Sequence, residues 1–257
     1  MSSAPRLWLA ARRDEARLAL MLLTRLPMGQ IANPPTLAAA VWAYPLAGVA
    51  VGAVIGGVYS GAVWLGLLAS VASVLAVTAG VVATGGMHED GLADLADGFG
   101  GGQTRARKLE IMRDSRVGSY GVIALVLALA LRLTLLAAMV GGWRTIFALI
   151  GLAAMSRAVL PVLMLTLPQA RAEGLGANAA AQVSRGAVFA AAGIGCALAL
   201  VGIPGAIAVI VVIAVAGAAM AMLAMRQIGG MTGDVFGATQ VVCELAGWIV
   251  LTAHLAH

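Results

Sequence analysis

The chain of 257 residues is 61% hydrophobic and only 11% charged, and its mean hydropathy of +0.99 lies far above the range of soluble globular proteins. The composition therefore excludes a soluble enzyme and indicates an integral membrane protein. The formal net charge of +5 does not indicate a nucleic-acid partner, because membrane proteins retain Lys and Arg on one side of the bilayer.

Residues 1–30 predict an amphipathic helix at a membrane surface. The stretch "RLWLAARRDEARLALMLLTRLP" places Arg12, Arg13, Asp14 and Arg17 opposite Leu and Trp side chains and then ends at a proline. Its charges interrupt the continuous apolar core that a cleavable signal peptide requires. Two positions stay open: the helix lies along the inner membrane surface, or it packs against the rest of the protein.

Seven apolar segments follow, and most of them reach the roughly 20 residues that an α-helix needs to cross about 30 Å of hydrocarbon. None alternates apolar and polar residues as a membrane β-strand does. We therefore expect an all-α, polytopic membrane protein with about seven transmembrane helices plus the N-terminal amphipathic helix, built as a single domain over residues 1–257. The predicted spans are 40–60, 62–84, 119–140, 144–167, 187–203, 205–225 and 238–256.

The basic residues predict the orientation, because Lys and Arg next to the ends of spans are retained in the cytoplasm. If the N-terminus is internal, all but three of the 16 Lys and Arg residues fall on the internal side. Arg132 and Arg157 lie inside spans, and Arg144 falls on the external side. We therefore expect the N-terminus and the loops 85–118 and 226–237 to be cytoplasmic.

The loop 85–118 is unusually acidic and is the expected active-site loop. In the segment "HEDGLADLADG", Asp90, Asp94 and Asp97 share one face of a helix that we expect to extend from the second span. Like charges on one face repel each other unless a cation lies between them. Carboxylates without cysteine favour Mg²⁺, so the aspartates predict a magnesium site. The alternative is a solvated surface helix.

Basic side chains follow directly in "RARKLEIMRDSRVGSYG". Lys108, Arg113 and Arg116 have the donor groups that bind phosphate oxygens, next to a metal that would neutralise the same group. The alternative is that these cations are only retained on the internal side and pair with Glu110 and Asp114.

The last internal loop contains "GGMTGDVFGA" at 229–238, where Asp234 is the only acid. The sequence leaves two roles open for Asp234, the cap of the last helix and a contact to metal or phosphate. Charged residues inside the spans need partners in lipid, and for Arg132, Arg157 and Glu244 we expect structural pairing first. The alternatives are a polar substrate cavity for Arg157 and Glu244 and a side chain that extends to the membrane interface for Arg132. Cys196 and Cys243 both lie within spans, so neither a disulfide framework nor a zinc site is expected.

Four segments carry a resemblance to a known family: "LTRLP" at 23–27, "GGMHEDGLADLADGFGG" at 85–101, "RKLEIMRDSRVGSYGV" at 107–122 and "GGMTGDVFGA" at 229–238. Their order and spacing resemble the cobalamin synthase family, also called adenosylcobinamide-GDP ribazoletransferase. Glu89 stands where an apolar residue is expected from the resemblance, so it receives no role.

The resemblance implies a Mg²⁺-dependent transferase of the bacterial cytoplasmic (inner) membrane that acts in the last steps of cobalamin (vitamin B12) biosynthesis. Such an enzyme transfers adenosylcobinamide phosphate from adenosylcobinamide-GDP to α-ribazole, or to α-ribazole 5′-phosphate, and releases GMP. The product is adenosylcobalamin or its 5′-phosphate. The expected partners are these substrates and the lipid bilayer, while a homo-oligomer or a contact with other enzymes of the pathway stays open.

The resemblance, together with the residue pattern, implies three groups of site residues. The expected metal ligands, for one or two Mg²⁺ ions on the pyrophosphate, are Asp90, Asp94, Asp97 and Asp234. The expected contacts to phosphate oxygens come from Lys108, Arg113, Arg116 and Thr232. The candidate catalytic residues are His88, Asp94 and Asp114. Whether His88 or an aspartate deprotonates the attacking ribose hydroxyl stays open.

Two other classes also fit a polytopic chain with acids at the membrane edge. A CDP-alcohol phosphotransferase uses aspartates and Mg²⁺ for the same kind of exchange, but its pattern has Arg where this chain has Asp94, and its later pair of aspartates is absent. A secondary transporter would show an inverted repeat or paired broken helices, and neither is evident.

Overall fold

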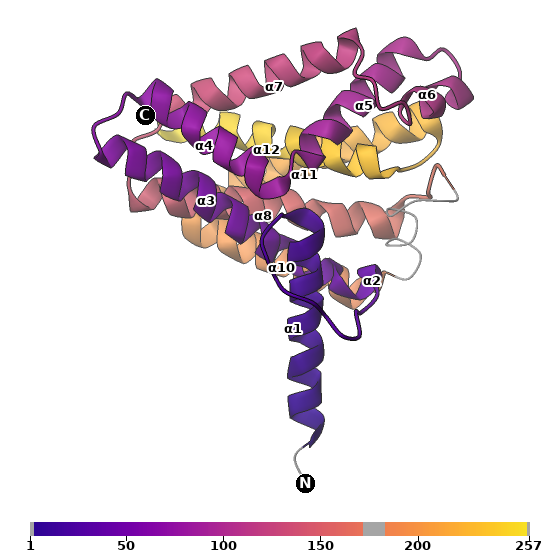
Figure 1. Cartoon of the computed structure of the whole chain (residues 1–257), viewed down its shortest axis with the longest axis horizontal. Coiled ribbons are helices and arrows are strands. Elements are labelled where there is room, and N and C mark those ends of the chain that lie inside the picture. The colour runs from indigo at the N-terminus through magenta and orange to yellow at the C-terminus, as the bar shows by residue number, and fades with distance from the viewer. Residues whose placement is uncertain (1–2, 172–182, 256–257) are drawn as a thin grey trace.

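The computed structural model describes residues 3–171 and 183–255, and within these ranges the chain is α-helical with connecting loops (Figure 1). A single β-bridge, between Gln169 and Met231, is the only extended pairing in the described ranges. The helices are α1 (Ser3–Leu23), α2 (Leu37–Ala40), the 3₁₀ turn η1 (Val41–Ala43), α3 (Tyr44–Trp64), α4 (Ala69–Thr84), α5 (Met87–Gly101), α6 (Arg105–Ile111), α7 (Ser119–Ala137), α8 (Trp143–Thr166), α10 (Arg185–Gly202), α11 (Ala206–Ile228) and α12 (Gly233–Leu255).

The predicted fold class is confirmed. Six helical segments are long and apolar enough to cross a membrane, and the count among the described residues rises to seven if the bent pair α4–α5 forms one span. The predicted spans correspond to α3, α4, α7, α8, α10, α11 and α12, with edges that differ by up to seven residues at the start of α4, which counts as a span only together with α5. Local length and hydropathy were sufficient for this prediction.

The expected continuation of the second span into the acidic segment is wrong. α4 ends at Gly85 and α5 begins after Gly86, and both glycines have left-handed backbone angles, with φ of 69° and 70°. Glycine adopts this conformation without steric cost and ends a helix there. As a result α5 leaves α4 at an angle of 88° and carries the aspartates in a new direction.

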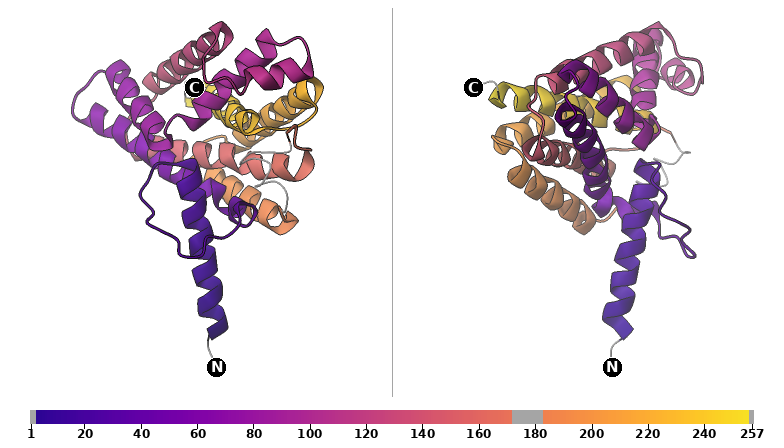
Figure 2. Two further views of the ribbon diagram at one scale, coloured as in Figure 1. Left: turned by 45° about the vertical axis from the view of Figure 1, so that its right-hand side comes forward. Right: turned by 60° about the vertical axis from the view of Figure 1, so that its left-hand side comes forward.

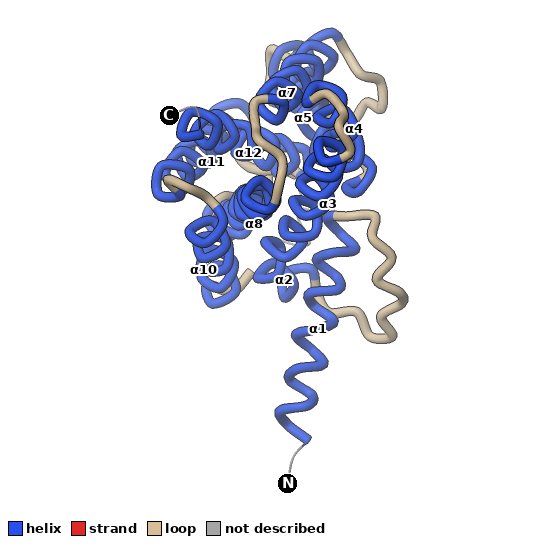
Figure 3. Tube along the Cα trace, turned by 90° about the vertical axis from the view of Figure 1, so that its left-hand side faces the viewer, coloured by secondary structure: helices blue, strands red, loops and turns tan. Residues whose placement is uncertain are grey.

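α8 is the central helix of the bundle. Viewed along the bundle, α8 lies among α3, α10, α11 and α12 (Figure 3). α3 packs against it through Gly48, Gly52 and Gly56, one glycine in each turn of the helix. At each of these positions an added Cβ atom would lie within 2.8 Å of the α8 backbone. Small residues allow this close approach between helices in lipid, where packing replaces the hydrophobic effect.

α1 runs across the direction of the other long helices, and its N-terminal half projects away from the bundle (Figures 1 and 2). The C-terminal half packs, since buried Glu15 accepts a hydrogen bond from Trp42 Nε1 at 2.6 Å. In the projecting half, Leu7, Trp8 and Leu9 are at least 60% exposed. The C-terminal half of α1 therefore packs against the rest of the protein, and the position of its exposed half on the membrane surface stays a prediction.

Candidate functional site

The acidic residues of two distant segments come together because α5 and α12 cross in close contact. At Gly91 an added Cβ atom would lie 2.8 Å from the carbonyl oxygen of Asp234 and 3.2 Å from Gly237 Cα. At Gly237 it would lie 3.3 Å from His88 Cα. A side chain at Gly91 would force the two helices apart, and one at Gly237 would fit only tightly. The two glycines therefore bring Asp90 and the first turn of α12 together at one site.

Thr232, and not Asp234, is the residue that caps the N-terminus of α12. The Thr232 hydroxyl accepts a hydrogen bond from Val235 N at 3.3 Å, as an N-cap residue does. The same hydroxyl donates to Asp234 Oδ2 at 3.2 Å. The capping role therefore belongs to Thr232, and the Asp234 carboxylate remains available to other groups.

Arg171 lies beside Asp234, and the sequence analysis did not select it. Its Nη1 is 3.4 Å from Asp234 Oδ2, and its Nη2 donates to the carbonyl oxygen of Leu109 at 2.9 Å. Hydrogen bonds between residues 168–170 and Met231 hold the preceding loop against the start of α12. Partial burial lowers the pKa of Arg171, whereas the carboxylate of Asp234 opposes this change. No local motif marks Arg171, because its role arises from this long-range loop contact.

A cavity of about 220 Å³ lies at this crossing. Asp90 and Asp234 contribute the carboxylates of its lining, and His88 and Tyr44 contribute its other titratable groups. The remaining lining residues are mostly apolar and come from α1, α5, α8 and α12: Leu22, Leu23, Met87, Leu160, Met164 and Phe236. A cavity with a few convergent polar groups in an apolar lining is typical of a binding site.

Asp97 has a different place from the one expected of a metal ligand. Its carboxylate accepts hydrogen bonds from Gly118 N at 2.7 Å and Gly121 N at 2.9 Å, at the start of α7. Asp97 is buried there and satisfies two amides that a helix N-terminus leaves without partners. In the part of the chain that the structure describes, no group of three or more His, Cys, Asp or Glu side chains is arranged to hold a metal ion.

The basic residues expected to bind phosphate are dispersed. Lys108 Nζ donates to the side chain of Gln227, and Arg113 is exposed. Arg116 pairs with Asp114 at 2.6 Å on the exposed surface, and this hydrogen bond lowers the pKa of Asp114 to about 2. Asp114 does not line the cavity that contains Asp90 and Asp234. It lines a separate, open depression together with Asp97.

His88 lies at the junction of two cavities. It lines the cavity described above and also a smaller one of about 20 Å³ inside the bundle. The side chain is only 2% exposed, and neither ring nitrogen has a hydrogen-bond partner among the described residues. A ring nitrogen without a partner is available to a bound molecule.

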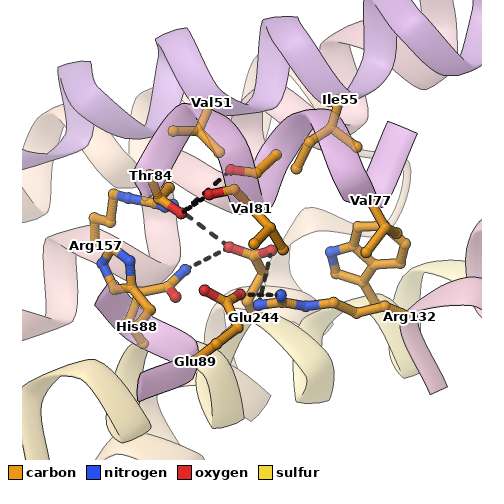
Figure 4. Close-up of a pocket in the computed structure, with 13 residues that line it drawn as sticks. Val51, Ile55, Val77, Val81, Thr84, His88, Glu89, Arg132, Arg157 and Glu244 are labelled. Atoms are coloured by element: carbon orange, nitrogen blue, oxygen red, sulfur yellow. Dashed lines mark hydrogen bonds and ion pairs between the residues drawn. The ribbon is translucent and has the colours of Figure 1, made fainter. Parts of the chain in front are cut away.

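The smaller cavity contains a network of buried charges (Figure 4). Glu244 lies 3.4 Å from Arg157 and 3.7 Å from Arg132, which confirms the expected pairing of these residues. Glu89, to which the sequence analysis gave no role, forms an ion pair with Arg132. Gln240 donates to Glu244, so a polar side chain supports the acid as well.

Comparison with known proteins gives consistent results. A family model described as cobalamin-5-phosphate synthase matches residues 15–252. A protein of Mesorhizobium japonicum is 45% identical over 256 residues, 98% of each chain, and one of Bradyrhizobium diazoefficiens is 43% identical over 242 residues, 93% of each chain. A protein of Xanthobacter autotrophicus is 46% identical over 225 residues, which covers 82% of this chain and 83% of that one. All three relatives are named adenosylcobinamide-GDP ribazoletransferase. No solved structure is significantly similar.

Proposed function

The chain belongs to the cobalamin-5-phosphate synthase family and is a transferase of cobalamin synthesis, and we propose that it works at the crossing of α5 and α12. The reaction transfers adenosylcobinamide phosphate from adenosylcobinamide-GDP to α-ribazole. A ribose hydroxyl attacks the phosphorus on the cobinamide side and loses its proton. The bond from that phosphorus to the bridging oxygen breaks, and GMP leaves. The family match favours this activity over a CDP-alcohol phosphotransferase and over a transporter.

One observation carries the choice of site. The close contact of Gly91 and Gly237 with the facing backbone joins Asp90 of α5 to Asp234 of α12, with Arg171 beside Asp234. A pyrophosphate that transfers one phosphoryl group needs charge neutralisation more than covalent chemistry. We propose that Arg171 binds a phosphate oxygen with its remaining donors, since the carbonyl oxygen of Leu109 and the carboxylate of Asp234 hold its guanidinium at the crossing.

We propose that Asp90, Asp94 and Asp234 hold Mg²⁺ together with the phosphates of the substrate. Mg²⁺ usually takes one or two carboxylates plus waters and phosphate oxygens rather than a closed protein cage, so the ion can bind with the substrate although no three acidic groups of the described residues already surround a metal position. When bound, the ion would neutralise charge on the pyrophosphate. Asp97 is left out of the proposed set because the amides at the start of α7 occupy its carboxylate.

His88 remains the candidate base. It lines the cavity with Asp90 and Asp234, and a ring nitrogen without a partner can accept the proton of the ribose hydroxyl. We also propose that the site faces the cytoplasm of a bacterial inner membrane, with the N-terminus on the same side, because the basic residues gather there.

Release of GMP by the purified protein in lipid nanodiscs tests the proposal. We expect Asp90→Asn, Asp94→Asn and Asp234→Asn to lower turnover and to raise the Mg²⁺ concentration required for half-maximal rate. Asp14→Asn is the matched control, because Asp14 pairs with Arg17 on α1, away from the site. Full activity of Asp94→Asn with unchanged Mg²⁺ dependence would remove Asp94 from the proposed metal site.

A further inference from the structure

The cavity at the α5–α12 crossing combines two kinds of lining, and the combination restricts what it can bind. The carboxylates come from α5 and α12, whereas Leu22 and Leu23 of α1 and Leu160 and Met164 of α8 are apolar. Such a cavity suits a ligand with a flat apolar body and few polar atoms. It does not suit a phosphate group, because none of the residues that line it is a lysine or an arginine.

Tyr44 supplies a polar group that the protein itself leaves without a partner. This residue begins α3 and lines the cavity, and its side chain is 1% exposed. Its hydroxyl has no hydrogen-bond partner among the described residues, and the same holds for both ring nitrogens of His88. A buried hydroxyl without a partner is unfavourable, so a ligand that supplies an acceptor compensates that cost.

The size of the cavity points to one ring system. At about 220 Å³ it lies below the roughly 300–1,000 Å³ of pockets that enclose a whole drug-sized ligand. A corrin macrocycle is much larger than this space. Guanine would also fit by size, but its N–H donors would need the carboxylates of Asp90 and Asp234, which the proposed metal site uses, and the apolar side chains of α1 and α8 offer no other partners.

We propose that this cavity binds the aromatic base of the acceptor nucleoside, with the Tyr44 hydroxyl donating a hydrogen bond to its free ring nitrogen. This inference rests on the proposed function. The base of α-ribazole is a dimethylbenzimidazole, a flat bicyclic group with two methyl groups. One ring nitrogen bears the ribose, so a single nitrogen accepts a hydrogen bond. The apolar side chains surround the ring, and the ribose then lies on the side of Asp90 and Asp234.

Substitution of Tyr44 tests the hydrogen bond, with the rate of GMP release measured while each substrate is varied in turn. We expect Tyr44→Phe to raise the KM for α-ribazole roughly tenfold, as the loss of one buried hydrogen bond does, and to leave the KM for adenosylcobinamide-GDP unchanged. Tyr59→Phe is the matched control. Tyr59 is also buried on α3, but its hydroxyl already donates to the carbonyl oxygen of Met139 at 2.7 Å.

A change in the size of the cavity gives a second, independent test that the acceptor base binds there. Met164→Ala enlarges the cavity, so the ratio of kcat/KM for a naphthimidazole riboside to that for α-ribazole should rise. Met155→Ala, at another buried position of α8 outside the cavity, should leave the ratio unchanged. Because the ratio compares two acceptors on the same preparation, a partial loss of folded protein does not affect it.

The outcomes separate this inference from the proposed function. If the wild-type protein releases no GMP, the proposed function fails. If the wild-type protein is active and Tyr44→Phe leaves the KM for α-ribazole unchanged, the inference is overturned and the function stands. It is also overturned if Tyr44→Phe raises only the KM for adenosylcobinamide-GDP, because the cavity would then hold the donor. Calorimetric titration of α-ribazole alone, weaker for Tyr44→Phe than for wild type, supports the inference without turnover.

Discussion

Glu89 of α5 and Arg132 of α7 form an ion pair inside the bundle, 43 residues apart in the chain. Arg132 also lies 3.7 Å from Glu244, which in turn lies 3.4 Å from Arg157. Two cations and two anions are therefore balanced within one buried network. An apolar residue is expected at position 89 from the resemblance, and the ion pair with Arg132 accounts for an acid at this buried place.

Removal of one member of this network should destabilise the protein. We expect Glu89→Leu to lower stability by about 3 kcal/mol, since it leaves two buried arginines, Arg132 and Arg157, with Glu244 as their one acidic partner in this network. The double variant Glu89→Leu/Arg132→Leu should recover most of the loss, because the remaining pair of Glu244 and Arg157 stays balanced. Thermal unfolding in detergent of the wild-type protein, Glu89→Leu, Arg132→Leu and the double variant measures the coupling energy between the two residues. Losses that simply add in the double variant would show that the pair contributes nothing.

Gly91 should be sensitive to a single added methyl group. We expect Gly91→Ala to reduce GMP release strongly, because its Cβ atom would lie 2.8 Å from the carbonyl oxygen of Asp234 and push α5 away from α12. Gly193→Ala on α10 is the control, since its Cβ atom would meet nothing within 4 Å. Both proteins should fold, as judged by circular dichroism. Wild-type turnover of Gly91→Ala would contradict the role of the close crossing.

Asp97 should behave as a structural residue. We expect Asp97→Ala to lower stability by about 1–3 kcal/mol, because Gly118 N and Gly121 N lose their acceptor. The Mg²⁺ dependence of the remaining activity should match that of the wild-type protein. A shift of the Mg²⁺ titration as large as the one expected for Asp94→Asn would instead restore Asp97 to the ligand set that the sequence predicted.

Asp114 should not control the pH dependence of the reaction. The hydrogen bond from Arg116 lowers its pKa to about 2, below the ordinary value of about 3.9. A carboxylate with a lowered folded-state pKa contributes stability above its unfolded pKa and loses it only as the pH falls towards 2. Asp114 is therefore ionised at every pH from about 5 to about 9. The profile of kcat/KM over this range should be the same for Asp114→Asn, and a displaced limb would assign Asp114 a catalytic proton.

The sequence predicted the spans well because the length and hydropathy of a segment are local properties. It also predicted the pairing of Arg157 with Glu244, since charges in lipid require partners. The direction of α5 was not predictable in the same way, because two glycines next to each other permit several conformations. Asp97 shares a helix face with Asp90 and Asp94, yet its partners lie at the start of α7. Spacing within one helix does not reveal a contact with another helix.

Arg171 and Tyr44 show a second limit of sequence reasoning. Neither residue belongs to a patterned cluster, and each reaches the site only because other segments position it. The β-bridge between Gln169 and Met231 positions Arg171. The convergence of α1, α3 and α8 positions Tyr44. A single cation in a loop or a tyrosine at the start of a span gives no local signal. Such residues are found from the folded arrangement.

The contact between α3 and α8 has a consequence for how the sequence can diverge. Gly48, Gly52 and Gly56 approach the α8 main chain, and an added methyl group at any of them has no space to occupy. The partner contributes mainly backbone atoms to this seam, which every amino acid carries. Substitutions should therefore be purged at the three glycines of α3 over evolutionary time. The α8 side chains beside these contacts, among them Leu149, Ala153 and Ala154, are buried as well, so larger residues there should also be selected against.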